Sequence, residues 1–217
     1  MFSLTVLHTF AQSKYSKLSF GFGAGCNMSY TDVNKGKIGY TTTAAIDAKL
    51  LPFISFGLEG QYGLVKGGDI NSDPHNRQFS NQYLSYTANG KIILDEVFDS
   101  DFVRGLYFGA GVGLIQNKIT QVVRYKPDTE VKYPPLGYLF PGQDKSINIV
   151  VPANLGFNFF ISDVSGLYKF AFNANAQLNY TFGEGLDGYN DPEGRFKNNK
   201  ADQFFVFSVG IKYLFGR

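Results

Sequence analysis

The sequence predicts an all-β fold, an eight-stranded antiparallel up-and-down transmembrane β-barrel, on three observations. Eight segments alternate apolar and polar residues at period two, which gives each extended strand one apolar face. The connections between these segments are alternately short and long, as in barrels that cross a membrane. The 217 residues include 25 Gly, 22 Phe and 14 Tyr, a composition that suits strands with aromatic girdles. A chain of this length is enough for one all-β domain.

The eight predicted strands are all longer than the roughly 9–11 residues that a tilted strand needs to cross a bilayer. They cover residues 17–30, 38–51, 53–65, 83–94, 104–120, 147–160, 167–182 and 203–215. The long connections, 66–82, 121–146 and 183–202, all fall at one end of such a barrel. An even strand count places both termini at the other end, together with the short turns.

The last strand shows the alternation most clearly. From Phe205 to Phe215 every odd position is apolar, whereas Ser208, Gly210 and Lys212 occupy even positions. Faces rich in Gly, Asn, Gln, Ser and Lys are poor material for a dry core, so we expect them to line the lumen while the apolar faces contact lipid. Four phenylalanines test this, since a membrane barrel places them outside and a soluble carrier inside: Phe20, Phe108, Phe172 and Phe207.

Composition excludes several classes of protein. The net charge is only +2, whereas nucleic-acid-binding proteins are strongly basic, so no nucleic-acid partner is expected. No run of about 18 apolar residues occurs, so no membrane-spanning helix is predicted. Cys26 is the only cysteine, which leaves no disulfide framework and no CxxC metal site. Cys26 falls on the apolar face of the first strand, and no cofactor is expected.

Two parts of the chain are predicted, residues 1–13 as the remnant of a secretory signal peptide and residues 14–217 as the barrel. The first part has an apolar run, then small residues, then a polar start at Ser13 and Lys14. It lacks a basic region before the apolar run, so we expect the precursor to begin further upstream. The alternative is an ordinary N-terminal strand or plug.

Six charged residues fall on the predicted lumen face near the end with the short turns. Because charges taken out of bulk water must pair, we predict an ion-pair network in the lumen around Asp47 and Glu59. Its cations are four lysines: Lys49, Lys91, Lys169 and Lys212. The outer half of the lumen is expected to be neutral and polar: Asn27, Thr43, Gln61, Asn154, Asn175 and Asn179. Inward glycines on the first and fifth strands leave bare walls that long side chains should fill.

Three local motifs suggest chemistry but lack its context. Glycine-rich runs at 21–25 and 109–113 resemble dinucleotide loops without the helix that such loops open. Residues 69–73 match the start of a calcium loop, but Pro74 stands where its glycine belongs. His75, the only histidine of the predicted mature chain, has serines nearby but no nucleophile–base geometry that a sequence can support. We therefore predict no enzymatic activity.

The connection at 121–146 is stiff and apolar for a surface loop. Four prolines stiffen it, and five apolar side chains are candidate partner contacts: Tyr125, Tyr133, Tyr138, Leu139 and Phe140. Such a loop either packs over the mouth of the barrel or offers aromatic anchors to a partner. The sequence leaves both alternatives open.

Residues 208–215, Ser-Val-Gly-Ile-Lys-Tyr-Leu-Phe, resemble the terminal signal of outer-membrane β-barrels. The likeness is carried by Ser208, Gly210, Tyr213 and Phe215, although two further residues follow. In that family the assembly machinery binds the last strand. The strand pattern of the whole barrel segment also resembles small eight-stranded barrels, namely OmpA-like transmembrane domains, OmpW-like barrels and the PorT-like barrels associated with protein secretion.

The resemblance implies a location in a Gram-negative outer membrane, with both termini in the periplasm. The expected function is a structural or protein-interaction role, including that of a subunit in a larger envelope or secretion assembly. The alternatives are a narrow channel or port for small apolar molecules and a lipid-modifying barrel enzyme. The expected partners are the lipid bilayer, the assembly machinery through the last strand, and other envelope proteins through the long loops.

Overall fold

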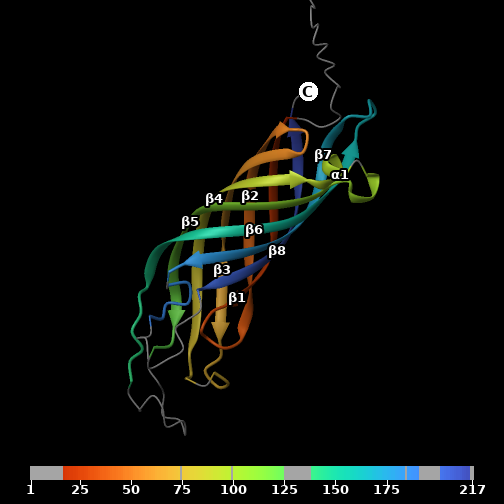
Figure 1. Ribbon diagram of the computed structural model, residues 1–217. Helices are drawn as coiled ribbons and strands as arrows, with labels where there is room; N and C mark the ends of the chain where they lie inside the picture. The colour runs from red at the N-terminus through yellow and green to blue at the C-terminus, as the bar shows by residue number, and fades with distance from the viewer. Residues whose placement is uncertain are drawn as a thin grey trace, which may run out of the picture.

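The computed structural model describes residues 17–73, 75–98, 100–124, 138–183, 185–190 and 201–215. In this part of the chain eight antiparallel strands follow one another around a closed barrel, and β8 pairs with β1 to complete the ring (Figure 1). The strands are β1 (Leu18–Tyr30), β2 (Gly36–Leu51), β3 (Ile54–Gly68), β4 (Gln78–Ile93), β5 (Leu106–Val122), β6 (Lys145–Ser162), β7 (Tyr168–Phe182) and β8 (Gln203–Phe215). The predicted fold class is confirmed.

The two ends of the barrel differ. We call the end where β1 begins and β8 ends the terminal end. There, tight turns join β2 to β3 and β6 to β7, while the β4–β5 connection contains helix α1 (Leu94–Phe98) and the 3-10 turn η1 (Asp101–Val103). At the opposite end, the loop end, lie the two longest connections, β5–β6 (residues 123–144) and β7–β8 (residues 183–202), together with the β1–β2 and β3–β4 connections (Figure 1). The expected alternation of short and long connections is wrong at one place, because β4–β5 (residues 94–105) is longer than β3–β4 (residues 69–77). No helix among the described residues has the length and apolarity to span a membrane.

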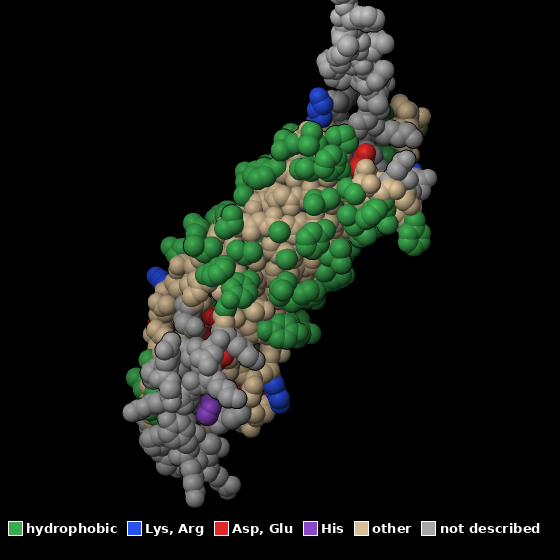
Figure 2. All heavy atoms as spheres, in the orientation of Figure 1, with side chains coloured by type: hydrophobic (Ala, Val, Ile, Leu, Met, Phe, Trp, Pro, Cys, Tyr) green, Lys and Arg blue, Asp and Glu red, His purple; other side chains and the backbone are tan. Residues whose placement is uncertain are grey.

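The outer surface of the barrel carries an apolar belt. The four test phenylalanines, Phe20, Phe108, Phe172 and Phe207, lie on it with exposed fractions of 44%, 51%, 53% and 48%. Figure 2 shows hydrophobic side chains covering the wall between the two ends, while Lys and Arg side chains on this face lie beyond the belt. Such a wall is stable against hydrocarbon rather than water, so the predicted apolar-out arrangement is confirmed. Cys26 is exposed on the same surface as a free thiol.

In the loop half of the barrel the alternation reverses. Strand β4 begins at Gln78, earlier than the predicted start at residue 83. In this first part of β4, Phe79 and Tyr83 are buried in the interior, and the pleat turns Gln78 and Gln82 outward. An apolar-in, polar-out pattern belongs to a wall that faces water, which is why a search for lipid-facing strands missed it. The strands therefore continue past the membrane belt at this end.

The reversed alternation builds an apolar core inside the loop half. Its members come from the strands and from the connections that fold over the mouth: Val33, Val65, Phe79, Tyr83, Ile115, Phe140, Val150, Leu186, Tyr189, Phe204 and Val206. The loop half does contain predicted polar residues, since Asn27 and Asn179 are buried there, but it also contains this apolar core, which was not predicted. There the interior resembles that of a small soluble barrel, filled by side chains.

Candidate functional site

A buried ion triad crosses the terminal half of the lumen. Asp47 on β2 accepts a hydrogen bond from the Lys91 ammonium on β4 at 2.6 Å and another from the Lys212 ammonium on β8 at 3.1 Å. The two cations use different carboxylate oxygens, Oδ1 and Oδ2 respectively, so a single anion holds both. The three side chains are only 8%, 8% and 12% exposed. Ions this far from water are tolerated because they meet opposite charges. We call these three residues the lumen triad.

Each side chain of the triad leans over a glycine on the next strand around the barrel, and one lumen tyrosine does the same. The register pairs are Asp47 with Gly57, Lys91 with Gly109, Lys212 with Gly21, and Tyr107 with Gly156. A Cβ on Gly109 would lie 3.0 Å from Lys91 Cγ, and a Cβ on Gly57 would overlap the Asp47 carboxylate. The glycines therefore leave space for side chains that lie along the wall. The bare walls are filled as expected, but from the neighbouring strand in each case.

Tyr107 packs against both lysines and was absent from the predicted site residues. Its ring centroid lies 5.5 Å from the Lys91 nitrogen and 5.2 Å from the Lys212 nitrogen, within the range of a cation–π interaction. Its hydroxyl donates to Asn175 Oδ1 at 3.3 Å and accepts from Asn173 Nδ2 at 3.1 Å. The sequence did carry a signal, since Tyr107 shares the parity of the inward glycines of its strand.

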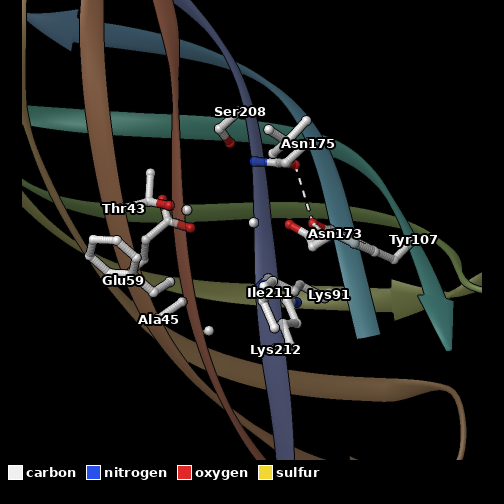
Figure 3. Close-up of a pocket in the computed structure, with 15 residues that line it drawn as sticks. Thr43, Ala45, Glu59, Lys91, Tyr107, Asn173, Asn175, Ser208, Ile211 and Lys212 are labelled. Carbon is white, nitrogen blue, oxygen red and sulfur yellow. Dashed lines mark hydrogen bonds between the residues drawn. The ribbon is translucent and has the colours of Figure 1, made fainter. Parts of the chain in front are cut away.

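Two small cavities lie on either side of the triad. The first, of about 30 Å³, lies between Glu59 and the two lysines and also touches Tyr107. Figure 3 shows Glu59 on one wall of this cavity, with Lys91 and Lys212 together on another. The second, of about 80 Å³, lies toward the terminal end, where Lys17 contributes to its lining. Because Lys91 and Lys212 line both cavities, the triad forms the partition between them. Each cavity is large enough for water.

A layer of amides and hydroxyls separates the first cavity from the apolar core. Glu59 Oε1 accepts from Gln61 Nε2 at 2.8 Å and from Gln177 Nε2 at 3.3 Å. Toward the loop end, the Thr41 and Tyr83 hydroxyls lie 2.8 Å apart in a further hydrogen bond. None of the ion pairs within the described residues includes Glu59. The charged network therefore has a single centre, the carboxylate of the triad, and Glu59 belongs to the neutral layer.

Two lysines predicted in the lumen network pair with carboxylates of the terminal-end connections rather than with Asp47, although Lys49 also lines the second cavity. Lys49 pairs with Glu96 of α1 at 3.0 Å, and Lys169 pairs with Asp163 of the β6–β7 turn at 3.1 Å. Both lysines stand near strand ends at this rim, where the connections supply carboxylates. The prediction grouped them with the triad from strand parity, which fixes the face of a residue but not its depth in the barrel.

The connections at the loop end form a cap held by buried polar groups. Arg77 Nε lies 3.7 Å from Asp73 Oδ1, and Arg77 Nη2 donates to the backbone carbonyl of Asp32 at 2.7 Å. The Tyr189 amide donates to Asp187 Oδ1 at 3.0 Å, and the Arg77 guanidinium lies 5.6 Å from the Tyr189 ring centroid. Burial raises the pKa of Asp187 to about 6, although the Tyr189 hydrogen bond and the Arg77 charge oppose the rise. Within the described residues, no group of three or more His, Cys, Asp or Glu side chains could hold a metal ion.

The candidate partner loop is described only in its last part, and Tyr125 and Tyr133 lie outside the described residues. Phe140 is buried in the apolar core, with its ring centroid 5.2 Å from that of Tyr138. Leu139, in contrast, is 67% exposed. The described part of this loop thus packs one aromatic over the mouth and leaves one aliphatic side chain at the surface.

The four residues of the predicted assembly signal occupy both faces of β8. Tyr213 and Phe215 lie on the lipid side with ring centroids 4.7 Å apart, whereas Ser208 is buried and lines the first cavity. Gly210 is registered with Gly23 of β1, and a Cβ on Gly210 would overlap the neighbouring backbone. Both edges of β8 are paired in the closed barrel. Binding of this strand by assembly machinery stays a prediction, and it concerns the chain before the barrel closes.

Several solved outer-membrane barrels resemble this structure. Neisserial surface protein A is 15% identical with a TM-score of 0.48, over 92% of this chain and 98% of that one. Ail of Yersinia pestis is 9% identical with a TM-score of 0.46, over 93% and 99%. The N-terminal β-barrel domain of Pseudomonas aeruginosa OprF is 11% identical with a TM-score of 0.41, over 90% and 97%. No protein-family model and no curated protein matches the sequence.

The chain is an integral β-barrel protein of the outer-membrane type, as its closed ring of strands, apolar belt and polar mid-lumen define. Within that class it is one of the small eight-stranded transmembrane barrels. The likenesses to solved structures concern the fold alone, and the assignment rests on the strand order and belt of this chain.

Proposed function

We propose that this protein is a non-conducting outer-membrane barrel with a structural or interaction role, whose capped loop end faces the outside of the cell. The observation that carries the proposal is that the lumen is closed at two depths. The lumen triad closes the terminal half, and the apolar core closes the loop half. Because nothing passes through such a lumen, the surfaces through which the protein can act are its cap, its rims and its outer wall.

Both closures oppose the passage of ions. An ion that entered from the terminal end would have to separate Asp47 from a lysine, and leaving a buried charge unpaired costs several kcal/mol. Beyond the triad it would meet the apolar core, in which Val65 and Phe204 are fully buried, and amides such as Asn81 that are already hydrogen-bonded to protein groups. Moving an unpaired ion into such a region is strongly unfavourable.

The conductance of the purified chain in planar lipid bilayers tests the closure. We expect no steady current, in membranes where a known porin added as a control conducts. A reproducible steady current from the unmodified chain would overturn the proposal and favour the alternative of a narrow channel or port.

The orientation is supported by the asymmetry of the connections, because outer-membrane barrels have short periplasmic turns and longer external loops. It can be tested by labelling intact cells with a membrane-impermeant maleimide. Asn71→Cys, in the exposed β3–β4 connection, should be labelled, whereas Ser165→Cys, an exposed polar position in the β6–β7 turn, should require an opened outer membrane. Cys26 faces the lipid side and serves as the internal control. The reverse labelling pattern would refute the orientation.

The interaction role is assigned to the cap because its buried polar contacts hold it in one arrangement at the mouth. Leu139 is the most exposed of the described candidate contacts. We expect Leu139→Asp to reduce co-purification of bound envelope proteins in mild detergent while the barrel stays folded. Unchanged co-purification would favour a purely structural role. The remaining alternative, a lipid-modifying enzyme, predicts that His75→Ala changes the mass of membrane lipid A, and we expect no change.

A further inference from the structure

The β4–β5 connection at the terminal end carries three apolar side chains that the described residues leave uncovered. Phe102 is 96% exposed, Phe98 is 65% exposed and Val97 is 49% exposed. Two exposed phenylalanines so close in sequence are costly in water, because each keeps a large apolar surface hydrated. The connection therefore needs an apolar environment that the described residues do not provide.

The connection is held in a defined orientation. Glu96 of α1 pairs with Lys49 at the end of β2 at 3.0 Å, which ties the polar side of this short helix to the barrel rim. Val97 and Phe98, the next two residues, then lie on the exposed side of the helix. Figure 1 shows α1 projecting sideways from this end of the barrel, and Figure 2 shows hydrophobic side chains on the same projection.

The exposed side chains continue the apolar belt. Ile92 on β4 and Phe108 on β5 are register partners on the outer wall, 45% and 51% exposed, and they stand just before and just after the connection. The two tight turns at this end repeat the pattern with exposed apolar groups, namely Leu50, Leu51, Phe53 and Val164. The terminal rim is therefore apolar where the belt ends, which is the depth of the membrane interface.

We propose that the β4–β5 connection is a membrane anchor, in which Val97, Phe98 and Phe102 insert into the interfacial layer of the lipid bilayer at the terminal end. Aromatic side chains are favoured at this depth of a membrane. The occupant is the bilayer rather than a protein, because the exposed surface is continuous with the lipid-facing wall. The anchor is independent of the closure of the lumen and of which side of the membrane the terminal end faces.

The absence of tryptophan from the sequence gives a direct test. Phe102→Trp introduces a single tryptophan, which can be excited selectively, at a side chain that is 96% exposed, so the fold should tolerate it. The variant is reconstituted into phosphatidylcholine vesicles whose acyl chains carry bromine at either a shallow or a deep position. We expect the shallow bromines to remove most of the emission, the deep ones to remove less, and iodide in the buffer to have little effect.

Two matched single-tryptophan variants calibrate the result. Phe108→Trp lies in the belt and should lose emission to bromines and resist iodide, while Asn71→Trp lies in an exposed loop and should do the opposite. Phe98→Trp repeats the measurement at a second anchor position. If Phe102→Trp and Phe98→Trp behave like Asn71→Trp, both side chains are in water in a pure lipid membrane. The anchor would then be refuted, and a periplasmic protein would be the better occupant.

Discussion

The two halves of the lumen are closed by opposite means. In the terminal half, one carboxylate and two ammonium groups meet inside a wall of glycines, with a small cavity on each side. In the loop half, apolar side chains from the strands and the cap pack together, and buried charged groups such as Arg77 and Asp187 lie at the cap. The terminal half lies within the membrane belt, so its outer wall must be apolar, which leaves polar residues for the inside. In the loop half, apolar side chains share the interior with buried amides such as Asn27 and Asn179, and β8 still presents Phe205 outward.

The difference shows that the contacts stabilising a barrel of this size are distributed differently in its two halves. A charged closure depends on a few specific contacts, so one substitution should have a large effect. An apolar closure is spread over many contacts, so its single substitutions should follow the size of the side chain removed.

The largest expected effect is in the triad. Asp47→Ala leaves two buried ammonium groups without their shared anion, and breaking a buried pair costs about 3–5 kcal/mol. We expect a decrease of this size in the free energy of unfolding, measured by urea titration in vesicles. Lys169→Gln is the control, because its pair with Asp163 lies at the solvent-exposed rim, where an ion pair contributes little. Similar losses for the two variants would show that the triad is hydrated.

The apolar closure is tested by two neighbouring phenylalanines on β8. Phe204 is fully buried in the core, whereas Phe205 is 39% exposed on the outer wall. We expect Phe204→Ala to decrease the free energy of unfolding by about 3 kcal/mol, since it leaves a cavity. Phe205→Ala should cost clearly less in vesicles, because lipid can fill the space. Equal losses would contradict a packed interior in the loop half.

The glycine wall is tested at Gly156, over which the Tyr107 ring lies. A Cβ there would overlap the ring, and forcing extra atoms into a packed site costs about 1–3 kcal/mol. We expect Gly156→Ala to lose stability in this range. Gly90→Ala is the control, because the nearest atom to its Cβ would be a backbone oxygen at 3.9 Å. If both variants unfold at the same urea concentration, the site at Gly156 can hold an additional methyl group beside the Tyr107 ring without strain.

The smallest effect concerns pH at the cap. Burial raises the pKa of Asp187 from its ordinary 3.8 to about 6, so between these values the folded cap holds a proton that the unfolded chain has released. The stability of the cap should therefore be greatest below about pH 4 and decrease as the pH rises to about 6. We expect Asp187→Asn to remove this decrease and to increase amide protection at Leu186 and Tyr189 at pH 7.

The control for the cap is Asp69, in the exposed β3–β4 connection. A backbone hydrogen bond from Asn71 lowers the pKa of Asp69, so its contribution is present at neutral pH and is lost as the pH falls. Asp69→Asn should leave the pH dependence between 4 and 6 unchanged at Leu186. A wild-type cap whose protection is flat across this window would contradict the assignment to Asp187.

The strand order, the lipid-facing side of each strand and the pairing partner Asp47 could be predicted from the sequence, because period-two alternation fixes which residues share a face. Alternation does not give depth along the barrel axis. For that reason Lys49 and Lys169 were grouped with Lys91 and Lys212, although only the second two reach the triad. The depth of a residue depends on the register between neighbouring strands. That register is set by two segments together, so the pattern of a single segment does not give it.

The apolar core was missed for a related reason. Phe204 and Val206 share the face of Ser208 and Gly210, and a search for lipid-facing strands treats them as exceptions at a strand end. At this level both faces of β8 are apolar, because Phe205 and Phe207 lie on the outer wall. The signal that could have found them is the outward polar series at the same level, such as Gln78 and Gln82 on β4. The role of the cap could not be predicted, since its contacts join connections that are distant in sequence.

The placement of the triad side chains and Tyr107 over glycines of the next strand has a consequence for how such proteins diverge. A larger residue in place of one of these glycines fits only if the side chain lying over it is replaced by a smaller one. Conversely, a smaller side chain there leaves a void that a larger residue at the glycine position can fill. Gly156 and Tyr107, or Gly109 and Lys91, should then change together between homologues, as compensated exchanges of volume. Substitutions in the interior of this barrel are therefore expected to be correlated between register partners.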